Sequence, residues 1–263
     1  LLVDILVRLG RLQDAMRVLE GEILDCGASD DLLTAALELR AKVGPMTVHA
    51  GPGGKQSVSL CMLAQNNGRS LALSLSKAKP LVQEVVVVDL GSTDRTREIA
   101  RAFGARVHEF PWSGDVSAAL NAALSKASGR WILVLDPAEV LAPDCTARFL
   151  DLVSRKTSGP AAYAFTTRYV GATAGNQAGD KKIRLFSRHR EIRFEDPQQP
   201  SLESSLRRLG VDVQDEPLTV ENFAKKDRAA SPERRGCDGD REASTSREAN
   251  TCAPTGIRVS GVA

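Results

Sequence analysis

The sequence has few aromatic residues, little net charge and no long apolar run. Phe, Trp and Tyr make up 4% of its 263 residues, which argues against base stacking and against an all-β sandwich. The 35 basic and 33 acidic residues give a net charge of +2, so the chain lacks the basic surplus of a dedicated nucleic-acid binder. The longest apolar runs, such as that at residues 85–90, are far shorter than the ~20 residues of a transmembrane helix. We therefore expect neither a nucleic-acid partner nor a membrane span.

The cysteines are odd in number and widely scattered, and no two of them form a Cys-x-x-Cys pair. This spacing argues against a zinc site and against a disulfide framework. We therefore expect a reducing compartment, the cytoplasm. The chain begins at Leu1 without an initiator Met or a leader, which is typical of a fragment or a processed chain.

Residues 1–44 carry apolar side chains at helical spacing, interrupted by Gly10 and Gly27. Ser29 is a suitable N-cap for a further helix. The pattern predicts short antiparallel helices, and the segment LVRLGRLQDAMRVLEGEI resembles the second half of a tetratricopeptide repeat (TPR). Two interpretations stay open: a TPR-like repeat, or a helical cap on the next domain.

Composition changes divide the remainder of the chain. Residues 45–56 are rich in Gly and Pro without periodicity, which indicates a linker. Residues 57–223 form the main predicted domain. Residues 224–263 contain charges of both signs, Ser, Gly and Pro but no aromatic residue, so we expect a disordered tail.

Within the main domain, short apolar strands alternate with helices. Strands are predicted at residues 57–63, 84–89 and 130–136, with a minor one at 105–108, and helices at 69–79, 95–103 and 116–126. This alternation predicts right-handed βαβ units and an α/β fold with a mostly parallel sheet. Farther on, we expect helices at 147–155 and 202–209 and strands at 161–169, 182–186 and 218–220.

Two of the predicted strands end in an aspartate, Asp89 and Asp136. Ligands of open parallel sheets bind at the carboxyl ends of the strands. After Asp89, Gly91 permits a tight turn and Ser92 can cap the following helix. A carboxylate at one strand end can accept hydrogen bonds from a sugar or a base, and one at another strand end can hold a divalent cation against phosphates. The alternative is that each aspartate only caps a turn or helix.

The segments SVSLCMLAQNNG, VVVVDLGSTDRT, FPW, LDPAEVL, KIRLF and IRFED occur in one order along the chain. In that order they resemble family-2 nucleotide-sugar glycosyltransferases of the GT-A type, in particular the bacterial subgroup associated with TPRs. The resemblance implies a GT-A-like, Rossmann-like sheet with flanking helices.

It also implies an inverting transfer from a nucleotide sugar, assisted by Mn²⁺ or Mg²⁺. The acceptor would be a protein, a lipid-linked molecule or a polysaccharide, and the N-terminal helices would offer a surface to a protein partner. The implied metal ligands are Asp136 and Glu139. The implied donor-binding residues are Asn66, Asp89, Gly91, Ser92, Asp94, Asn121 and Asp136.

Several positions depart from the family pattern. Leu120 stands where the family has an arginine, Ala138 replaces the second aspartate of Asp-x-Asp, and Gln199-Pro200 replaces a His-Glu pair. Glu195 is the nearest remaining carboxylate that could serve as a base. These losses keep a second interpretation open, a catalytically impaired binding or scaffold protein. The basic cluster Arg184, Arg188, His189 and Arg190 is interpreted as a solvated face, and the histidines His49, His108 and His189 as structural or surface residues.

Overall fold

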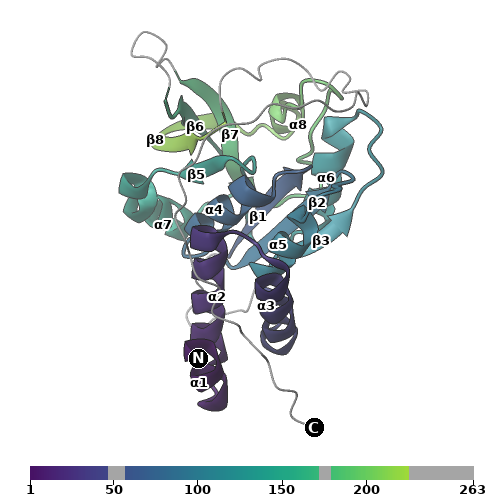
Figure 1. Ribbon diagram of the computed structural model, residues 1–263. Helices are drawn as coiled ribbons and strands as arrows, with labels where there is room; N and C mark the ends of the chain where they lie inside the picture. Colours follow the sequence, from purple (N-terminus) through teal and green to yellow (C-terminus); the bar gives the residue numbers. More distant parts are fainter. Residues whose placement is uncertain (47–56, 172–178, 225–263) are drawn as a thin grey trace.

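The computed structural model describes residues 1–46, 57–171 and 179–224. Outside these ranges lie most of the predicted linker, including His49, and the predicted tail except for its first residue. The first half of the main domain has the predicted alternation of strands and helices (Figure 1). Its elements are β1 (Val58–Ala64), α4 (Gly68–Ala78), β2 (Glu84–Asp89), α5 (Thr96–Ala102), β3 (Arg106–Glu109), α6 (Val116–Lys126) and β4 (Trp131–Val134).

The second half extends the same sheet with strands of both directions. Its elements are β5 (Glu139–Leu141), the 3-10 helix η1 (Pro143–Cys145), α7 (Thr146–Ser154), β6 (Ala162–Tyr169), β7 (Asp180–Ser187), α8 (Glu203–Arg208) and β8 (Val213–Asn222). The strand order is β3-β2-β1-β4-β7-β6-β8-β5. The pairs β3-β2, β2-β1, β1-β4 and β6-β8 are parallel, and the other pairs are antiparallel. The α/β class is confirmed, with a parallel half that continues into a mixed half.

Strand β2 shows why its sequence is an unbroken apolar run. Successive strand side chains point to opposite faces of a sheet. Val85 and Val87 lie in the core cluster that contains the α4 and α5 side chains, whereas Val86 and Val88 lie in the cluster that contains α6. Both faces of the sheet are therefore covered, as expected for parallel strands joined by helices.

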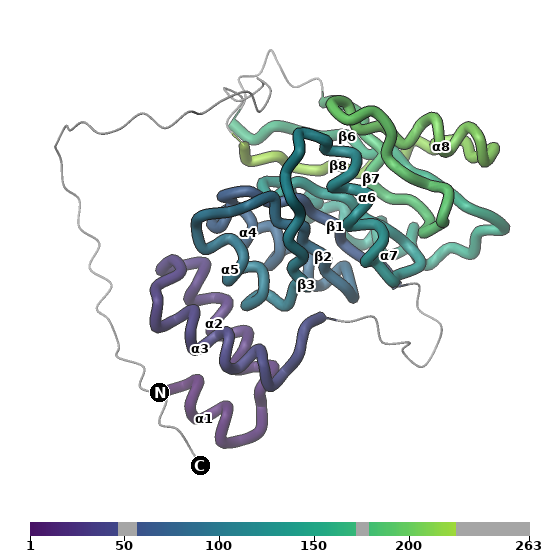
Figure 2. Tube along the Cα trace, turned by 90° about the vertical axis from the view of Figure 1, so that its right-hand side faces the viewer, coloured from purple at the N-terminus to yellow at the C-terminus, as the bar shows by residue number. Residues whose placement is uncertain are grey.

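The N-terminal helices pack directly on the main domain. They are α1 (Leu2–Arg8), α2 (Leu12–Cys26) and α3 (Asp30–Val43), and the Ser29 hydroxyl accepts a hydrogen bond from Leu32 N at 3.4 Å as a cap. Helices α2 and α3 lie side by side beneath α4 and α5 (Figure 2). The predicted hairpin thus shares one hydrophobic core with the sheet. Among the described residues, no helix combines the length and apolarity that crossing a bilayer requires.

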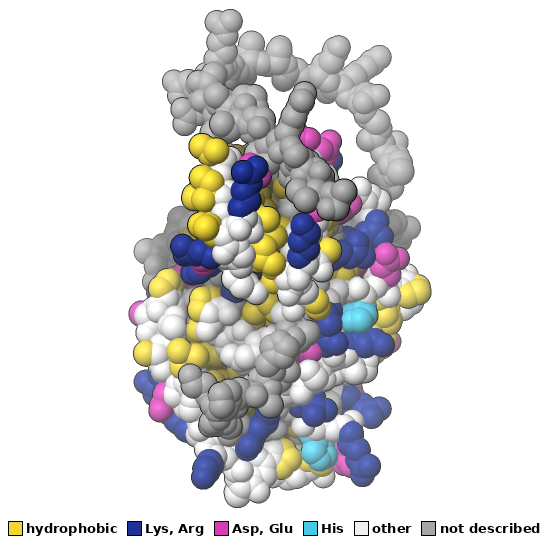
Figure 3. Space-filling view, turned by 90° about the horizontal axis from the view of Figure 1, so that it is seen from below, with side chains coloured by type: hydrophobic (Ala, Val, Ile, Leu, Met, Phe, Trp, Pro, Cys, Tyr) yellow, Lys and Arg dark blue, Asp and Glu magenta, His cyan; other side chains and the backbone are white. Residues whose placement is uncertain are grey.

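The far end of the helical segment leaves apolar side chains in solvent. Figure 3 views the molecule from this end and shows apolar side chains on the surface. The exposed ones on and beside α1 are Leu1, Leu2, Ile5 and Leu9.

Candidate functional site

The carboxyl ends of β2 and β4 lie at the same edge of the sheet, on either side of β1. Ala64 at the end of β1 pairs with Asp89. On the other side, Leu135 N donates to Cys61 O at 3.4 Å, just before Asp136. The topology therefore brings Asp89 and Asp136 to one edge, separated by a single strand.

Asp89 is a buried carboxylate, 1% exposed, with one oxygen engaged. Its Oδ2 accepts hydrogen bonds from the backbone N–H groups of Gly91 at 3.2 Å and Ser92 at 3.0 Å. Gly91 has φ 89°, a left-handed conformation that suits glycine and lets the turn fold back on the carboxylate. The Oδ1 atom is buried without a hydrogen-bond partner among the described residues. It is a buried acceptor that the described residues leave unsatisfied.

Asn66 and Asp94 join the two loops at this edge to one another. Asn66 Oδ1 accepts from Thr93 N at 2.9 Å and Asp94 N at 3.3 Å, and Asn66 N donates to Ser92 Oγ at 3.0 Å. Asp94 Oδ1 accepts from Thr96 N at 2.9 Å at the start of α5. Both residues, predicted as donor-binding, therefore hold the turn that carries Gly91 and Ser92.

Asn121 on α6 holds the chain that follows β7. Its Nδ2 donates to Phe194 O and its Oδ1 accepts from Phe194 N, both at 2.9 Å. Ser117 Oγ, one turn earlier, donates to Asp196 O at 2.6 Å. The amide group of Asn121 is thus engaged with the backbone, which fixes the segment that closes one side of the site.

A cavity of about 860 Å³ opens beside Asp136. Leu63 at the end of β1 lines it, and so do Leu120, Gln199 and Pro200, the replacements of the family's arginine and His-Glu pair. Asp136 itself is exposed. Leu120 and the pair Gln199-Pro200 depart from the family pattern and lie some 80 positions apart in the chain. In the folded protein they line one cavity.

The family resemblance implied that Glu139 is a metal ligand, but in the structure its carboxylate is buried and hydrogen-bonded to other residues of the chain. It is 0% exposed. Its Oε1 accepts from Arg184 Nη2 at 2.6 Å and Asn222 Nδ2 at 3.1 Å, and its Oε2 accepts from Asp136 N at 2.9 Å. Burial, and next to it the Asp136 carboxylate, raise the pKa of the Glu139 carboxyl, whereas Arg184 opposes the rise. This geometry does not support the predicted metal-ligand role of Glu139.

The structure also corrects the interpretation of Arg184 as part of a solvated face, because its side chain is buried with Glu139. The sequence did not reveal this pair, since the two residues lie on β5 and β7, which are not neighbours in the chain.

Glu195, the candidate base, lies outside the Asp136 cavity. It forms an ion pair with Arg208, and a hydrogen bond from Arg208 lowers the pKa of its carboxyl. It lines a separate hollow with Glu191, Arg193, Ser205 and Arg208. The carboxylates that do line the Asp136 cavity, apart from Asp136, are Glu203 and Asp212. Both stand in ordinary polar segments, so no local sequence signal distinguishes them.

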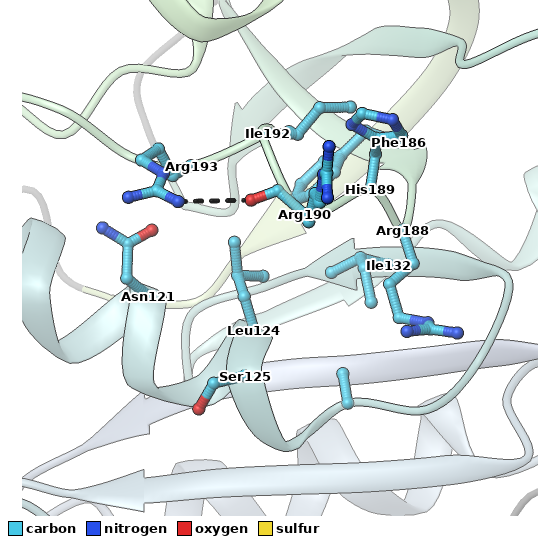
Figure 4. A pocket seen from close by; sticks show the side chains of 11 residues that line it. Asn121, Leu124, Ser125, Ile132, Phe186, Arg188, His189, Arg190, Ile192 and Arg193 are labelled. Carbon is cyan, nitrogen blue, oxygen red and sulfur yellow. Dashed lines mark hydrogen bonds between the residues drawn. The ribbon is translucent and has the colours of Figure 1, made fainter.

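A second hollow, of about 420 Å³, lies between α6 and the turn after β7 (Figure 4). Figure 4 shows Asn121 and Leu124 on the helix below and Arg190 and Arg193 on the loop above. Arg193 Nη2 donates to Arg190 O at 3.3 Å. Arg188, in the same turn, uses its Nε to donate to Gly129 O at 3.0 Å. The arginines beside this hollow thus contact the backbone of their own loop and of the turn before β4.

His108, on β3, is half-buried, and desolvation lowers its pKa, with the Lys126 and Arg106 charges adding to this effect. It lines another hollow, away from Asp136, with residues of β2, α5, β3 and α6.

A metal site requires several oxygen, nitrogen or sulfur ligands in reach of one point. Among the described residues, no group of three or more His, Cys, Asp and Glu side chains has that arrangement. Asp136 supplies one free carboxylate, Ala138 supplies none, and Glu139 is held by Arg184. The donor set therefore does not fit a resident divalent cation.

Comparison with protein families matches most of the main domain to one family. The family described as glycosyl transferase family 2 matches residues 59–206. A TPR repeat-containing protein of Synechococcus elongatus is 36% identical over 149 residues, 57% of this chain and 36% of that protein. An uncharacterized glycosyltransferase of Rickettsia felis is 35% identical over 89 residues, 34% of this chain and 31% of that protein. The chain thus spans about a third of the length of these relatives.

Among solved structures, a glucosyl-3-phosphoglycerate synthase from Mycobacterium tuberculosis, in complex with Mn²⁺, uridine diphosphate and glucosyl-3-phosphoglycerate, aligns with a TM-score of 0.48. The alignment has 19% identity and covers 69% of this chain and 80% of that chain.

Proposed function

Because the chain belongs to glycosyl transferase family 2, we propose that it binds a nucleotide sugar at the carboxyl edge of the sheet and transfers the sugar to an acceptor hydroxyl with inversion. The observation that carries this proposal is the buried Asp89 carboxylate, whose Oδ1 has no partner among the described residues. Leaving such an acceptor unsatisfied costs about 1–3 kcal/mol. A base N–H or a ribose hydroxyl that donates to Oδ1 would remove this cost.

The donor's diphosphate and sugar would extend from Asp89 past the end of β1 to Asp136 and its cavity. A cavity of about 860 Å³ is within the range of small-molecule sites. In the transfer, the acceptor oxygen forms the bond to the anomeric carbon from the side opposite the diphosphate. The bond to the diphosphate breaks, the nucleoside diphosphate leaves, and a carboxylate takes the acceptor's proton. Glu203 and Asp212 are the candidates for that base, because both line the cavity.

The expected Mn²⁺ or Mg²⁺ is not part of this proposal. The residues at Asp136 do not form a metal site among the described residues. The acceptor hydroxyl would belong to a protein, a lipid-linked molecule or a polysaccharide. Buried Cys61 and Cys145 are not in disulfides, which is in keeping with a reducing compartment such as the cytoplasm.

A second function, nucleotide-sugar binding without transfer, is favoured by Leu120, Gln199 and Pro200. These apolar or uncharged side chains line the cavity where the family has an arginine and a His-Glu pair. In that case the exposed apolar residues on and beside α1, namely Leu2, Ile5 and Leu9, would serve to dock a protein partner.

Titration calorimetry with uridine and guanosine diphosphates and their sugars tests donor binding. We expect binding by the wild type and at least a tenfold loss in Asp89→Asn. The matched control is Glu38→Gln, which removes an exposed carboxylate on α3, far from this edge. Thermal melting of both variants separates lost binding from lost folding. Absence of binding for every nucleotide, or equal binding by Asp89→Asn, would overturn the proposal.

A further inference from the structure

We propose that this chain neutralises the donor's diphosphate with its own cations, Lys182 and Arg207, in place of a metal ion. This inference rests on the proposed function, because it assumes a nucleotide-sugar donor. It differs from the expected metal-assisted transfer in the group that faces the phosphates.

Lys182 is on β7, the strand that pairs with β4. In the antiparallel pair of β4 and β7, Leu133 pairs with Leu185, and Arg184 Nη1 lies 3.5 Å from Val134 O. Lys182 lies three residues before Leu185 on β7, and Asp136 lies three residues after Leu133, just past the end of β4. Both residues line the cavity of about 860 Å³. Lys182 therefore lines the same cavity as Asp136, the residue that the family resemblance implied as a metal ligand.

The cationic side chains of the cavity differ in whether their charge is already paired. Four cationic residues line the cavity: Lys181, Lys182, Arg184 and Arg207. Lys181 forms an ion pair with Asp215, and Arg184 forms one with Glu139. Lys182 and Arg207 are exposed, and their side chains have no hydrogen-bond or ion-pair partner within the part of the chain that the structure describes. Their charges are therefore available to an anion.

Lys182 and Arg207 supply positive charge that other positions of the site lack. A diphosphate leaving group carries two or more negative charges, which catalysis must stabilise. Leu120 on α6 cannot do this, and Ala138 and Glu139 do not hold a cation at Asp136. Leu120 lines the same cavity as Lys182, so the positive charge missing from α6 is present on β7. Lysine binds phosphate well as a point charge, and arginine does so as a bidentate donor.

The experiment measures the affinity of the full chain for uridine diphosphate, uridine monophosphate and uridine. Each affinity is measured with excess EDTA and then with Mn²⁺. The guanosine analogues are used instead if guanosine diphosphate binds better. We expect the diphosphate affinity to change less than threefold between EDTA and Mn²⁺. Lys182→Met and Arg207→Met should each weaken diphosphate binding about tenfold. Uridine binding should stay the same, which a merely structural role of either residue would not predict. Lys182→Arg should retain most of the affinity.

The matched control is Lys156→Met, an exposed lysine after α7 that does not line the cavity. Diphosphate binding that requires Mn²⁺ would overturn this inference and leave the proposed function standing. Equal diphosphate binding by Lys182→Met, Arg207→Met and the wild type would also overturn this inference and leave the proposed function standing. A wild type that binds no nucleotide under either condition would overturn the proposed function itself.

Discussion

Arg184 and Glu139 form a fully buried ion pair, with Arg184 Nη2 donating to Glu139 Oε1 at 2.6 Å. The pair connects β7 to β5 directly behind Asp136, whose backbone N–H donates to the other Glu139 oxygen at 2.9 Å. Glu139, which the family resemblance implied as a metal ligand, therefore connects two strands and positions the loop of Asp136.

Removing one member of this pair should be costly, because the other charge would stay buried without compensation. We expect Arg184→Met to lower the free energy of unfolding by about 3–5 kcal/mol, measured by urea denaturation. The double variant with Glu139→Met should recover part of the loss, since no buried charge remains. A loss below about 1 kcal/mol in Arg184→Met would contradict the structural role of the pair.

Glu84, at the opposite edge of the sheet, should make folding stability depend on pH. Although burial raises its pKa, hydrogen bonds from Ser128 and Ser59 and the Arg106 charge outweigh this and lower the pKa of the carboxyl. The unfolded chain therefore binds this proton at higher pH than the folded chain. The ionised Glu84 carboxylate contributes its full stabilisation of the folded state above the pKa of the unfolded chain, about 4.3. This stabilisation is lost as pH falls through the lower folded pKa.

Glu84→Gln should remove this contribution and flatten the loss of stability below about pH 4.5, as followed by denaturant midpoints between pH 2 and 7. Glu38→Gln, which changes an exposed carboxylate, should keep the wild-type profile. Identical acid profiles for Glu84→Gln and the wild type would show that Glu84 does not contribute.

Glu20 connects the N-terminal helices to the main domain. It accepts from Arg40 Nη2 at 2.7 Å and forms an ion pair with Lys79 on the other side of the interface. Arg40 Nε also donates to Ala102 O at 3.0 Å. We expect Glu20→Gln to lower the free energy of unfolding by about 3 kcal/mol, because two buried or half-buried cations would lose their counter-charge. Calorimetric unfolding should still show one cooperative transition, and two separate transitions would contradict the shared core.

The choice of catalytic base can be tested with donor hydrolysis, in which water replaces the acceptor. We expect Glu203→Gln or Asp212→Asn to slow hydrolysis at least a hundredfold without changing donor affinity. Glu195→Gln should leave the rate within twofold, because Glu195 is paired with Arg208 outside the cavity. A hundredfold loss in Glu195→Gln alone would reverse this assignment.

Restoring family residues should separate an impaired enzyme from a binding protein. Ala138→Asp adds a carboxylate two residues after Asp136, and Leu120→Arg adds a cation to the cavity wall. In an impaired transferase we expect the double variant to hydrolyse the donor at least tenfold faster than the wild type, with a new dependence on Mn²⁺. An unchanged rate with intact donor binding would favour the binding-protein interpretation.

By itself, the sequence determined the α/β order, the strands that become β1, β2 and β4, and the family. Those elements are governed by local pattern: the valines of β2 must be buried on both faces, and Ser29 can only cap the helix beside it. Strand β5 was missed because three residues are too few to show a period. The strand ends Asp89 and Asp136 were found because parallel topology places such ends at one edge.

The tertiary structure alone decided what the charged residues do. Nothing near Glu139 in the chain indicates that Arg184 on β7 and Asn222 on β8 surround it, because that contact depends on the strand order and on the antiparallel register. Nor does the sequence indicate that Lys182 and Arg207 line one cavity, because this depends on how β7 and α8 are arranged in the fold. Charge pairing and desolvation act through space, so only the folded chain separates a buried structural carboxylate from one that faces a ligand.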